Sequence, residues 1–169
     1  KGALDWDTAG GHFSEFGLIR SRVRVELAWL AALSDEPAIP EVPPFDASAR
    51  AAVDGALAAF SPADAGRVKA IERTTNHDVK AVEYWLKERF AAVPEVARAS
   101  EFIHFACTSE DLNNLAHGVA LAPPRREILQ PVLREGQWHV TVAVHDTNRI
   151  IAVWPGFHEA AFGLAVDVG

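Results

Sequence analysis

The first part of the chain shows the apolar spacing that is typical of amphipathic helices. Over residues 13–33 apolar side chains recur every three or four positions, and they are Phe16, Ile19, Val23, Leu27 and Leu30. The charged residues of this segment fall at other positions: Arg20, Arg22, Arg24 and Glu26. The pattern predicts one long helix that turns its apolar stripe toward a core.

Prolines and polar caps divide the following residues into shorter helices. The prolines between residues 37 and 44 end the first helix, and a second helix is expected over 47–60. Ser61-Pro62-Ala63-Asp64 predicts a third helix, because Ser is a good N-cap, Pro fits the first helical position and an acid suits the first turn.

Two more helix starts follow. A fourth helix is expected over about 78–90, capped by Asn76 or Thr75, and a short helical piece near 96–106. Thr108 with Asp111 three residues later is close to a capping box. It would open a helix whose inward residues are Leu112, Leu115 and Val119.

The last part of the chain departs from this all-helical pattern. Pro123-Pro124 would interrupt or kink a continuing helix, because each proline lacks a backbone donor. Residues 138–144 are rich in β-branched side chains, residues 145–148 are turn-like, and residues 150–154 could return as a second strand. The predicted fold class is mainly α, with a possible short β-hairpin near the C-terminus.

Composition limits the function. A net charge of −7 argues against a general nucleic-acid binder, but a locally positive pocket could still hold a small anion. The single cysteine, Cys107, excludes an intrachain disulfide and fits a reducing, cytoplasmic setting. No apolar run approaches the ~20 residues that span a bilayer, and residues 1–7 lack the order of a signal peptide. A chain without an initiator Met is expected to be a fragment or a processed form.

The chemistry-bearing residues gather at two predicted helix starts, Thr74-Thr75-Asn76-His77-Asp78 and Thr108-Ser109. A helix N-terminus favours anions through its free N–H groups and its partial positive charge. Hydroxyl, amide and neutral imidazole groups add donors for a carboxylate or a phosphate. The alternative is that these residues are ordinary helix caps, which is what Ser, Thr, Asn and Asp usually are at such positions.

Other polar residues have simpler interpretations. His104 is expected to be a packed or hydrogen-bonded structural residue, and Asn113 with His117 a surface pair four residues apart. Glu83, Lys87, Glu88 and Arg89 are expected to form a solvated helix face. No HExxH, paired-cysteine or calcium-loop spacing occurs, so a metal site is not expected, and there is no glycine-rich phosphate loop either.

At the two clusters the sequence resembles the bacterial adenylosuccinate lyase family of the fumarase/aspartase superfamily. The resemblance covers roughly residues 13–133. The matching segments are Phe13–Ile19, Arg22–Glu26 with Trp29-Leu30, Lys69–Tyr84, which contains the motif TTNHDVKA, and Ser100–Asn114, which contains the motif HFACTSED. The last two segments are highly specific.

The resemblance implies a cofactor-free lyase of purine biosynthesis. Such enzymes release fumarate from adenylosuccinate, leaving AMP, and from the corresponding succinyl-carboxamide intermediate. The family's substrate pocket would include Thr75, Asn76, His77, Asp78, Thr108 and Ser109, with His77 supporting acid/base chemistry. Members of the family are homotetramers built on a bundle of long helices. Here residues 1–109 would form the helical N-terminal domain, residues 110–134 the start of the bundle, and residues 135–169 an unassigned tail.

The sequence also departs from the family pattern. The Gly-Arg-Tyr motif that helps hold the phosphate is absent from residues 1–12, and neither the Thr-His-Gly segment of the general acid nor the Ser-Ser-x-x-Met-Pro segment of the base occurs. We therefore expect a truncated form that is inactive alone. The alternative is a non-catalytic helical interaction module derived from the lyase.

Overall fold

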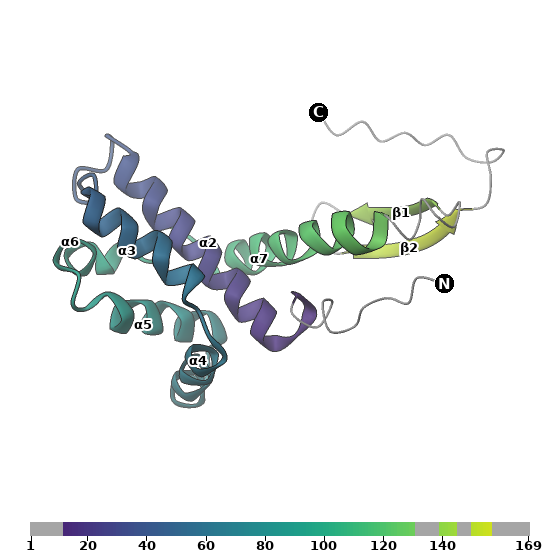
Figure 1. The fold of residues 1–169 in the computed structure, drawn as a ribbon, viewed down its shortest axis with the longest axis horizontal. Helices are drawn as coiled ribbons and strands as arrows, with labels where there is room; N and C mark the ends of the chain where they lie inside the picture. Colours follow the sequence, from purple (N-terminus) through teal and green to yellow (C-terminus); the bar gives the residue numbers. More distant parts are fainter. Residues whose placement is uncertain (1–11, 131–138, 145–149, 157–169) are drawn as a thin grey trace.

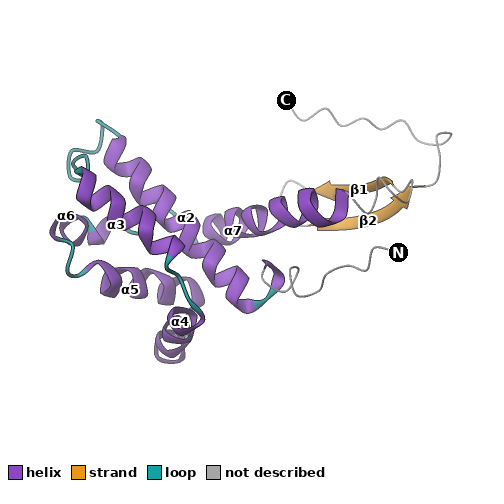
Figure 2. Ribbon diagram, viewed as in Figure 1, coloured by secondary structure: helices purple, strands orange, loops and turns teal. Residues whose placement is uncertain are grey.

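The computed structural model describes residues 12–130, 139–144 and 150–156. The helices are α2 (Glu15–Asp35), α3 (Ala47–Ala58), α4 (Pro62–Thr75), α5 (Asp78–Phe90), α6 (Pro94–Arg98) and α7 (Ser109–Pro124), with a 3₁₀ turn η1 (Ser100–Phe102) and a π-helix η2 (Arg125–Leu129). Strands β1 (His139–Val144) and β2 (Ile150–Gly156) pair antiparallel. The predictions of a mainly α fold and of a terminal hairpin are confirmed (Figure 2).

The long helix α2 is the centre of the fold. Helices α3 and α5 lie on either side of it, α4 packs on α5, and α7 crosses α2 and runs away from the helical body toward the end that carries the hairpin (Figure 1). The helix begins where Ser14 accepts a hydrogen bond from the Gly17 N–H, at 3.2 Å.

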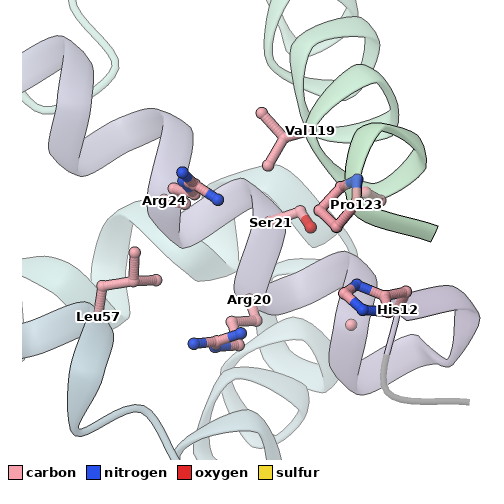
Figure 3. Close-up of a pocket in the computed structure, with 9 residues that line it drawn as sticks. His12, Arg20, Ser21, Arg24, Leu57, Val119 and Pro123 are labelled. Carbon is pink, nitrogen blue, oxygen red and sulfur yellow. The ribbon is translucent and has the colours of Figure 1, made fainter. Parts of the chain in front are cut away.

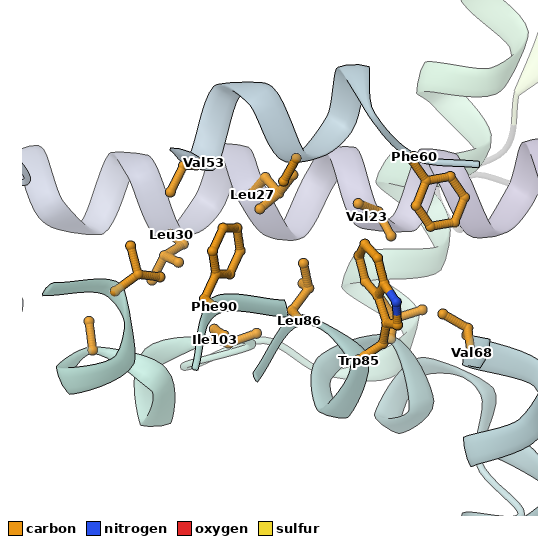
Figure 4. Close-up of a cluster of buried hydrophobic side chains, with 14 of the residues drawn as sticks. Val23, Leu27, Leu30, Val53, Phe60, Val68, Trp85, Leu86, Phe90 and Ile103 are labelled. Carbon is orange, nitrogen blue, oxygen red and sulfur yellow. The ribbon is translucent and has the colours of Figure 1, made fainter. Parts of the chain in front are cut away.

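The core lies between α2, α3 and α5. Figure 4 shows Val23, Leu27 and Leu30 of α2 facing Val53 of α3 on one side and Leu86 of α5 on the other. Each of these side chains is at most 5% exposed, and burying one contributes about 1.5–3 kcal/mol. Three rings close one end of the core: Phe60 stacks on Phe16 at 5.6 Å and meets Trp85 edge-on at 5.2 Å.

Most predicted caps are confirmed, but one is wrong. Ser61 caps α4 and Thr108 forms a capping box with Asp111, as predicted, and the Ser61 cap is also a complete capping box with Asp64. The cap of α5 is His77 rather than Asn76 or Thr75, because Asn76 is used to end α4 in the left-handed conformation, with φ 50°. Thr75 is the last residue of α4.

The proline pair changes the helix without stopping it. The α-helical hydrogen bonding of α7 ends at Pro124, and the chain continues as the π-helix η2. A proline has no N–H to give to the previous turn, so the regular pattern cannot continue past the pair. The apolar side of α7 was also only partly predicted: Leu112 is buried, whereas Leu115 is 56% exposed.

Three charged residues are buried, and for one of them, Glu83, the prediction of a solvated face is wrong. Arg22 is 7%, Glu26 1% and Glu83 4% exposed. The Glu83 carboxylate forms ion pairs with Lys80 at 2.7 Å and with Lys87 at 3.2 Å. Glu83 is therefore a buried acid whose charge is balanced by two lysines, and it does not lie on a solvated face. Arg22 and Glu26 belong to the candidate site.

Candidate functional site

The junction between α4 and α5 holds the first polar cluster. Asn76 turns the chain at the end of α4 and donates its N–H to the Glu72 carbonyl at 2.8 Å. Asparagine is one of the few residues that adopt this left-handed conformation readily. His77 is then extended and starts α5, where its Nδ1 accepts a hydrogen bond from the Lys80 N–H at 3.1 Å. The cluster is thus a tight turn between two helices.

Thr75 lies inside that turn and is occupied by the backbone. Its hydroxyl lies 3.3 Å from the Ile71 carbonyl and 3.1 Å from the His77 carbonyl, and it accepts a hydrogen bond from the His77 N–H at 3.4 Å. The hydroxyl therefore fixes the turn, and its hydrogen-bonding capacity is largely used locally.

The second cluster is the N-terminus of α7. The Thr108 hydroxyl accepts a hydrogen bond from the Asp111 N–H at 3.3 Å, and the Asp111 carboxylate accepts bonds from the Thr108 N–H and hydroxyl, both at 2.8 Å. These bonds from Thr108 lower the pKa of the exposed Asp111 carboxyl. Ser109 is the first helical residue, and its side chain remains outside the capping box.

The two clusters meet in space although 32 residues separate them in sequence. The Nε2 of His77 lies 3.4 Å from the Oγ of Ser109. Because Nδ1 accepts a bond from a backbone N–H, the proton of the neutral ring is on Nε2, which donates toward Ser109. The contact joins the N-termini of α5 and α7, which are the positive ends of their helix dipoles.

Arg22 of α2 also links α5 and α7, through one residue of each helix. Its Nη2 donates to the Asp78 carboxylate at 2.6 Å, and its Nε donates to the Asn113 Oδ1 at 2.9 Å. Partial burial acts to raise the pKa of Asp78, but the Val79 N–H and the Arg22 charge outweigh it, so that this pKa is lowered. Asn113 is therefore an internal partner of Arg22, and the prediction of a surface pair with His117 is wrong.

Glu26 lies one turn further along α2 and holds the segment that leads into α7. Its two carboxylate oxygens lie 2.7 Å from the His104 Nδ1 and 3.1 Å from the His104 backbone nitrogen, which donates to it. Burial raises the pKa of Glu26, against the lowering effect of His104. The prediction that His104 is a hydrogen-bonded structural residue is confirmed. Burial, then the charges of Glu26 and Asp111, raise the pKa of the nearby Cys107 thiol.

A separate pocket lies between α2, α3 and α7. Its walls include Arg20 and Arg24 of α2 and Val119 and Pro123 of α7 (Figure 3). Val119 is ten residues along α7 from Ser109, a distance of about 15 Å at 1.5 Å per residue. The pocket is therefore distinct from the His77–Ser109 contact.

The residues that the structure describes contain no group of three or more His, Cys, Asp or Glu side chains that could hold a metal ion. None of the helices in this part of the chain is long and apolar enough to cross a membrane.

Known proteins align with about three quarters of this chain. The chain is 56% identical to the adenylosuccinate lyase of Escherichia coli (strain K12) over 125 residues, which are 74% of this chain and 27% of that enzyme. It is 57% identical to the Haemophilus influenzae enzyme of the same name over 119 residues, 70% of this chain and 26% of that enzyme. The adenylosuccinate lyase of Legionella pneumophila (strain Corby) is 40% identical over 131 residues, 78% of this chain and 29% of that enzyme.

This chain is homologous to the N-terminal portion of adenylosuccinate lyase. The predicted resemblance to the N-terminal portion of that family is thus confirmed. The chain spans about a quarter of the length of these curated relatives. A second likeness concerns residues 110–160, which match the sequence model of a family described as the RACo linker region. It covers less than half of the chain and shows no family membership.

The structure brings some of the residues implied by the adenylosuccinate lyase resemblance together. His77 and Ser109 are in contact, and Asp78 is adjacent and bound to Arg22. Thr75 and Thr108 are engaged with nearby groups of their own turns, and Asn76 is an exposed turn residue.

Sequence reasoning missed the supports of this site. Arg22 is buried and binds Asp78 of the first cluster and Asn113 of α7, and Glu26 is buried and binds His104. One signal was present: the positions of Arg22 and Glu26 adjoin Val23 and Leu27 on the buried stripe, so a charge there must be paired inside the protein.

Proposed function

We propose that this chain supplies part of the substrate pocket for the release of fumarate from adenylosuccinate and from the succinyl-carboxamide purine intermediate. The observation that carries the proposal is the 3.4 Å contact between His77 Nε2 and Ser109 Oγ, at two helix N-termini. Homology to adenylosuccinate lyase over 74% of the chain supports it independently. The substrate fits the chemistry, because a succinyl group carries two carboxylates and the nucleotide a phosphate.

In this pocket Ser109, His77 and the first backbone N–H groups of α7 would bind a succinyl carboxylate. The elimination removes a proton beside a carboxylate, places negative charge on that carboxylate, and then breaks the carbon–nitrogen bond. Neutral donors already aimed at the carboxylate stabilise this charge more in the transition state than in the substrate. The pocket would therefore lower the activation free energy of the elimination as well as bind the substrate.

The geometry of His77 supports a role as a neutral hydrogen-bond donor. Its Nδ1 is used to cap α5 through the Lys80 N–H, so protonating the ring would break that cap. Giving up the Nε2 proton of a neutral ring would leave an imidazolate, which is far too basic for ordinary acid catalysis. We therefore assign His77 to binding and charge stabilisation, and the proton transfers to other groups.

The groups that transfer the protons determine whether this chain is active alone. The segments that carry the family's general acid and base do not occur in the sequence, which contains no methionine at all. We propose that this chain by itself binds substrate and turns it over little or not at all. A fumarate-release assay with adenylosuccinate tests this, and robust turnover by the purified chain would contradict it.

Binding is tested by calorimetric titration of the chain with adenylosuccinate. We expect saturable binding that weakens about tenfold or more in Ser109→Ala and His77→Ala, because each loses a hydrogen bond to a charged group. His77→Asn keeps an N-cap acceptor and separates loss of the ligand contact from loss of the helix cap. His117→Ala is the matched control, because His117 is an exposed histidine of α7 outside the site.

The second candidate function is a helical interaction module without catalysis. The observation that favours it is a set of exposed large apolar side chains among the described residues: Phe13, Trp29, Tyr84, Phe105 and Leu115. Homo-oligomerisation, as in the lyase family, would cover such side chains. Absence of adenylosuccinate binding, together with self-association in sedimentation, would favour this module over the pocket.

A further inference from the structure

Helix α2 carries two buried charged residues one turn apart, and each reaches a different part of the candidate site. Arg22 is 7% exposed and Glu26 only 1% exposed. Side chains at positions i and i+4 lie on the same face of a helix. Burying a charge is costly unless it is paired, and each of these two is paired with groups far away in the sequence.

Arg22 ties the start of α5 to the second turn of α7. The guanidinium donates through Nη2 to Asp78 at 2.6 Å and through Nε to Asn113 at 2.9 Å. Asp78 directly follows His77, and Asn113 lies four residues after Ser109. One planar group with a fixed geometry thus sets the separation of the two helices that carry the contact.

Glu26 shapes the turn that enters α7. One carboxylate oxygen accepts a hydrogen bond from the His104 backbone N–H at 3.1 Å, and the other lies 2.7 Å from the ring Nδ1. Both oxygens of Glu26 therefore contact His104. His104 and Ala106 have φ values of 65° and 58°, a left-handed conformation that residues with a Cβ rarely adopt. The carboxylate holds this strained turn, which ends at the Thr108 cap.

We infer that Arg22 and Glu26 are positioning residues, which set the N-termini of α5 and α7 so that His77 Nε2 meets Ser109 Oγ. A buried pair of charges often stabilises a fold less than well-packed apolar residues would, and in some proteins it fixes a geometry that apolar packing leaves loose. The inference concerns the arrangement of the site, and its effect on substrate binding rests on the proposed function.

The test compares conservative variants in the full chain. Arg22→Lys keeps the charge but cannot donate to Asp78 and Asn113 through one rigid fork. Glu26→Gln keeps the shape but replaces one acceptor oxygen with a donor, facing the two donors of His104. Leu30→Val is the control: it removes one methylene from the buried face of the same helix, without a polar contact at the site.

Two readouts separate positioning from general stability. The first is the nuclear Overhauser contact between the His77 ring and the Ser109 β protons, with the ¹⁵N shifts of the ring. The second is the affinity for adenylosuccinate by calorimetry. We expect Arg22→Lys and Glu26→Gln to lose the contact and about tenfold in affinity, and Leu30→Val to keep both.

Three results would overturn the inference or the proposed function. If either site variant keeps the parent's His77–Ser109 contact and affinity, the inference is overturned for that residue. It is overturned altogether if Leu30→Val loses the contact to the same extent. If the parent does not bind adenylosuccinate, the proposed function fails, while the ring contact and the ¹⁵N shifts still decide whether Arg22 and Glu26 position the site.

Discussion

The Nε2 of His77 lies 3.4 Å from the Oγ of Ser109, and this single contact joins the starts of two helices. Each residue is also fixed locally, His77 by capping α5 and Ser109 by following the Thr108 capping box. The consequences for stability and reactivity can be measured one residue at a time.

Removing the cap of α5 should destabilise the protein. His77→Ala deletes the acceptor of the Lys80 N–H, and loss of an N-cap costs about 1 kcal/mol. His77→Asn should retain most of this stability, because Asn accepts the same kind of bond. Urea denaturation followed by circular dichroism measures the difference. Equal stability of parent and His77→Ala would show that the ring does not cap the helix.

The ion pair of Asp78 with Arg22 should make stability depend on pH at acidic values. The pKa of Asp78 is lowered in the folded protein, below its ordinary value of about 4. The stabilisation is therefore complete well above pH 4 and is lost as the pH falls through the lowered pKa.

The check is the unfolding free energy of parent and Asp78→Asn between pH 7 and pH 3. The parent should be more stable at neutral pH, and the gap should narrow below about pH 4. A gap that is constant over the whole range would contradict a carboxylate paired with Arg22.

The core between α2, α3 and α5 should respond strongly to truncation. Leu86 is 1% exposed, so Leu86→Ala removes buried apolar surface and leaves a cavity, at a cost of about 2–5 kcal/mol. Leu115 is 56% exposed, and Leu115→Ala should change the free energy of unfolding by less than about 0.5 kcal/mol. Similar effects of the two substitutions would refute the assigned packing.

The thiol of Cys107 should be slow to alkylate. Its pKa is raised by burial and then by the charges of Glu26 and Asp111, so little thiolate is present at neutral pH. Iodoacetamide labelling followed by mass spectrometry should be slower in the folded chain than in urea. Glu26→Gln should accelerate it. Labelling at the same rate in both states would mean that the folded environment does not protect the thiol.

Local features of the fold were predictable from sequence because their causes lie within a few residues. The Ser61-Pro62-Ala63-Asp64 start of α4 and the Thr108–Asp111 box of α7 each contain both partners of the cap. The apolar stripe of α2 likewise needs only the helical repeat to be recognised.

The supports of the site were not predictable because their partners are remote. Arg22 meets Asp78 across 56 residues, and Glu26 meets His104 across 78 residues. The helical repeat places Arg22 and Glu26 beside the buried stripe and so indicates that each needs an internal partner, but only the folded chain shows which residue that partner is. His77 was missed as a cap because an imidazole seldom has that role, whereas Asn76 beside it is a common cap.

A ¹H–¹⁵N titration of the chain with adenylosuccinate tests the proposed pocket directly. We expect saturable shifts confined to the two helix starts, at the amides of Lys80, Ser109 and Asp111 and at the His77 ring. Absence of saturable shifts, or shifts confined to the separate pocket around Arg20 and Arg24, would contradict it.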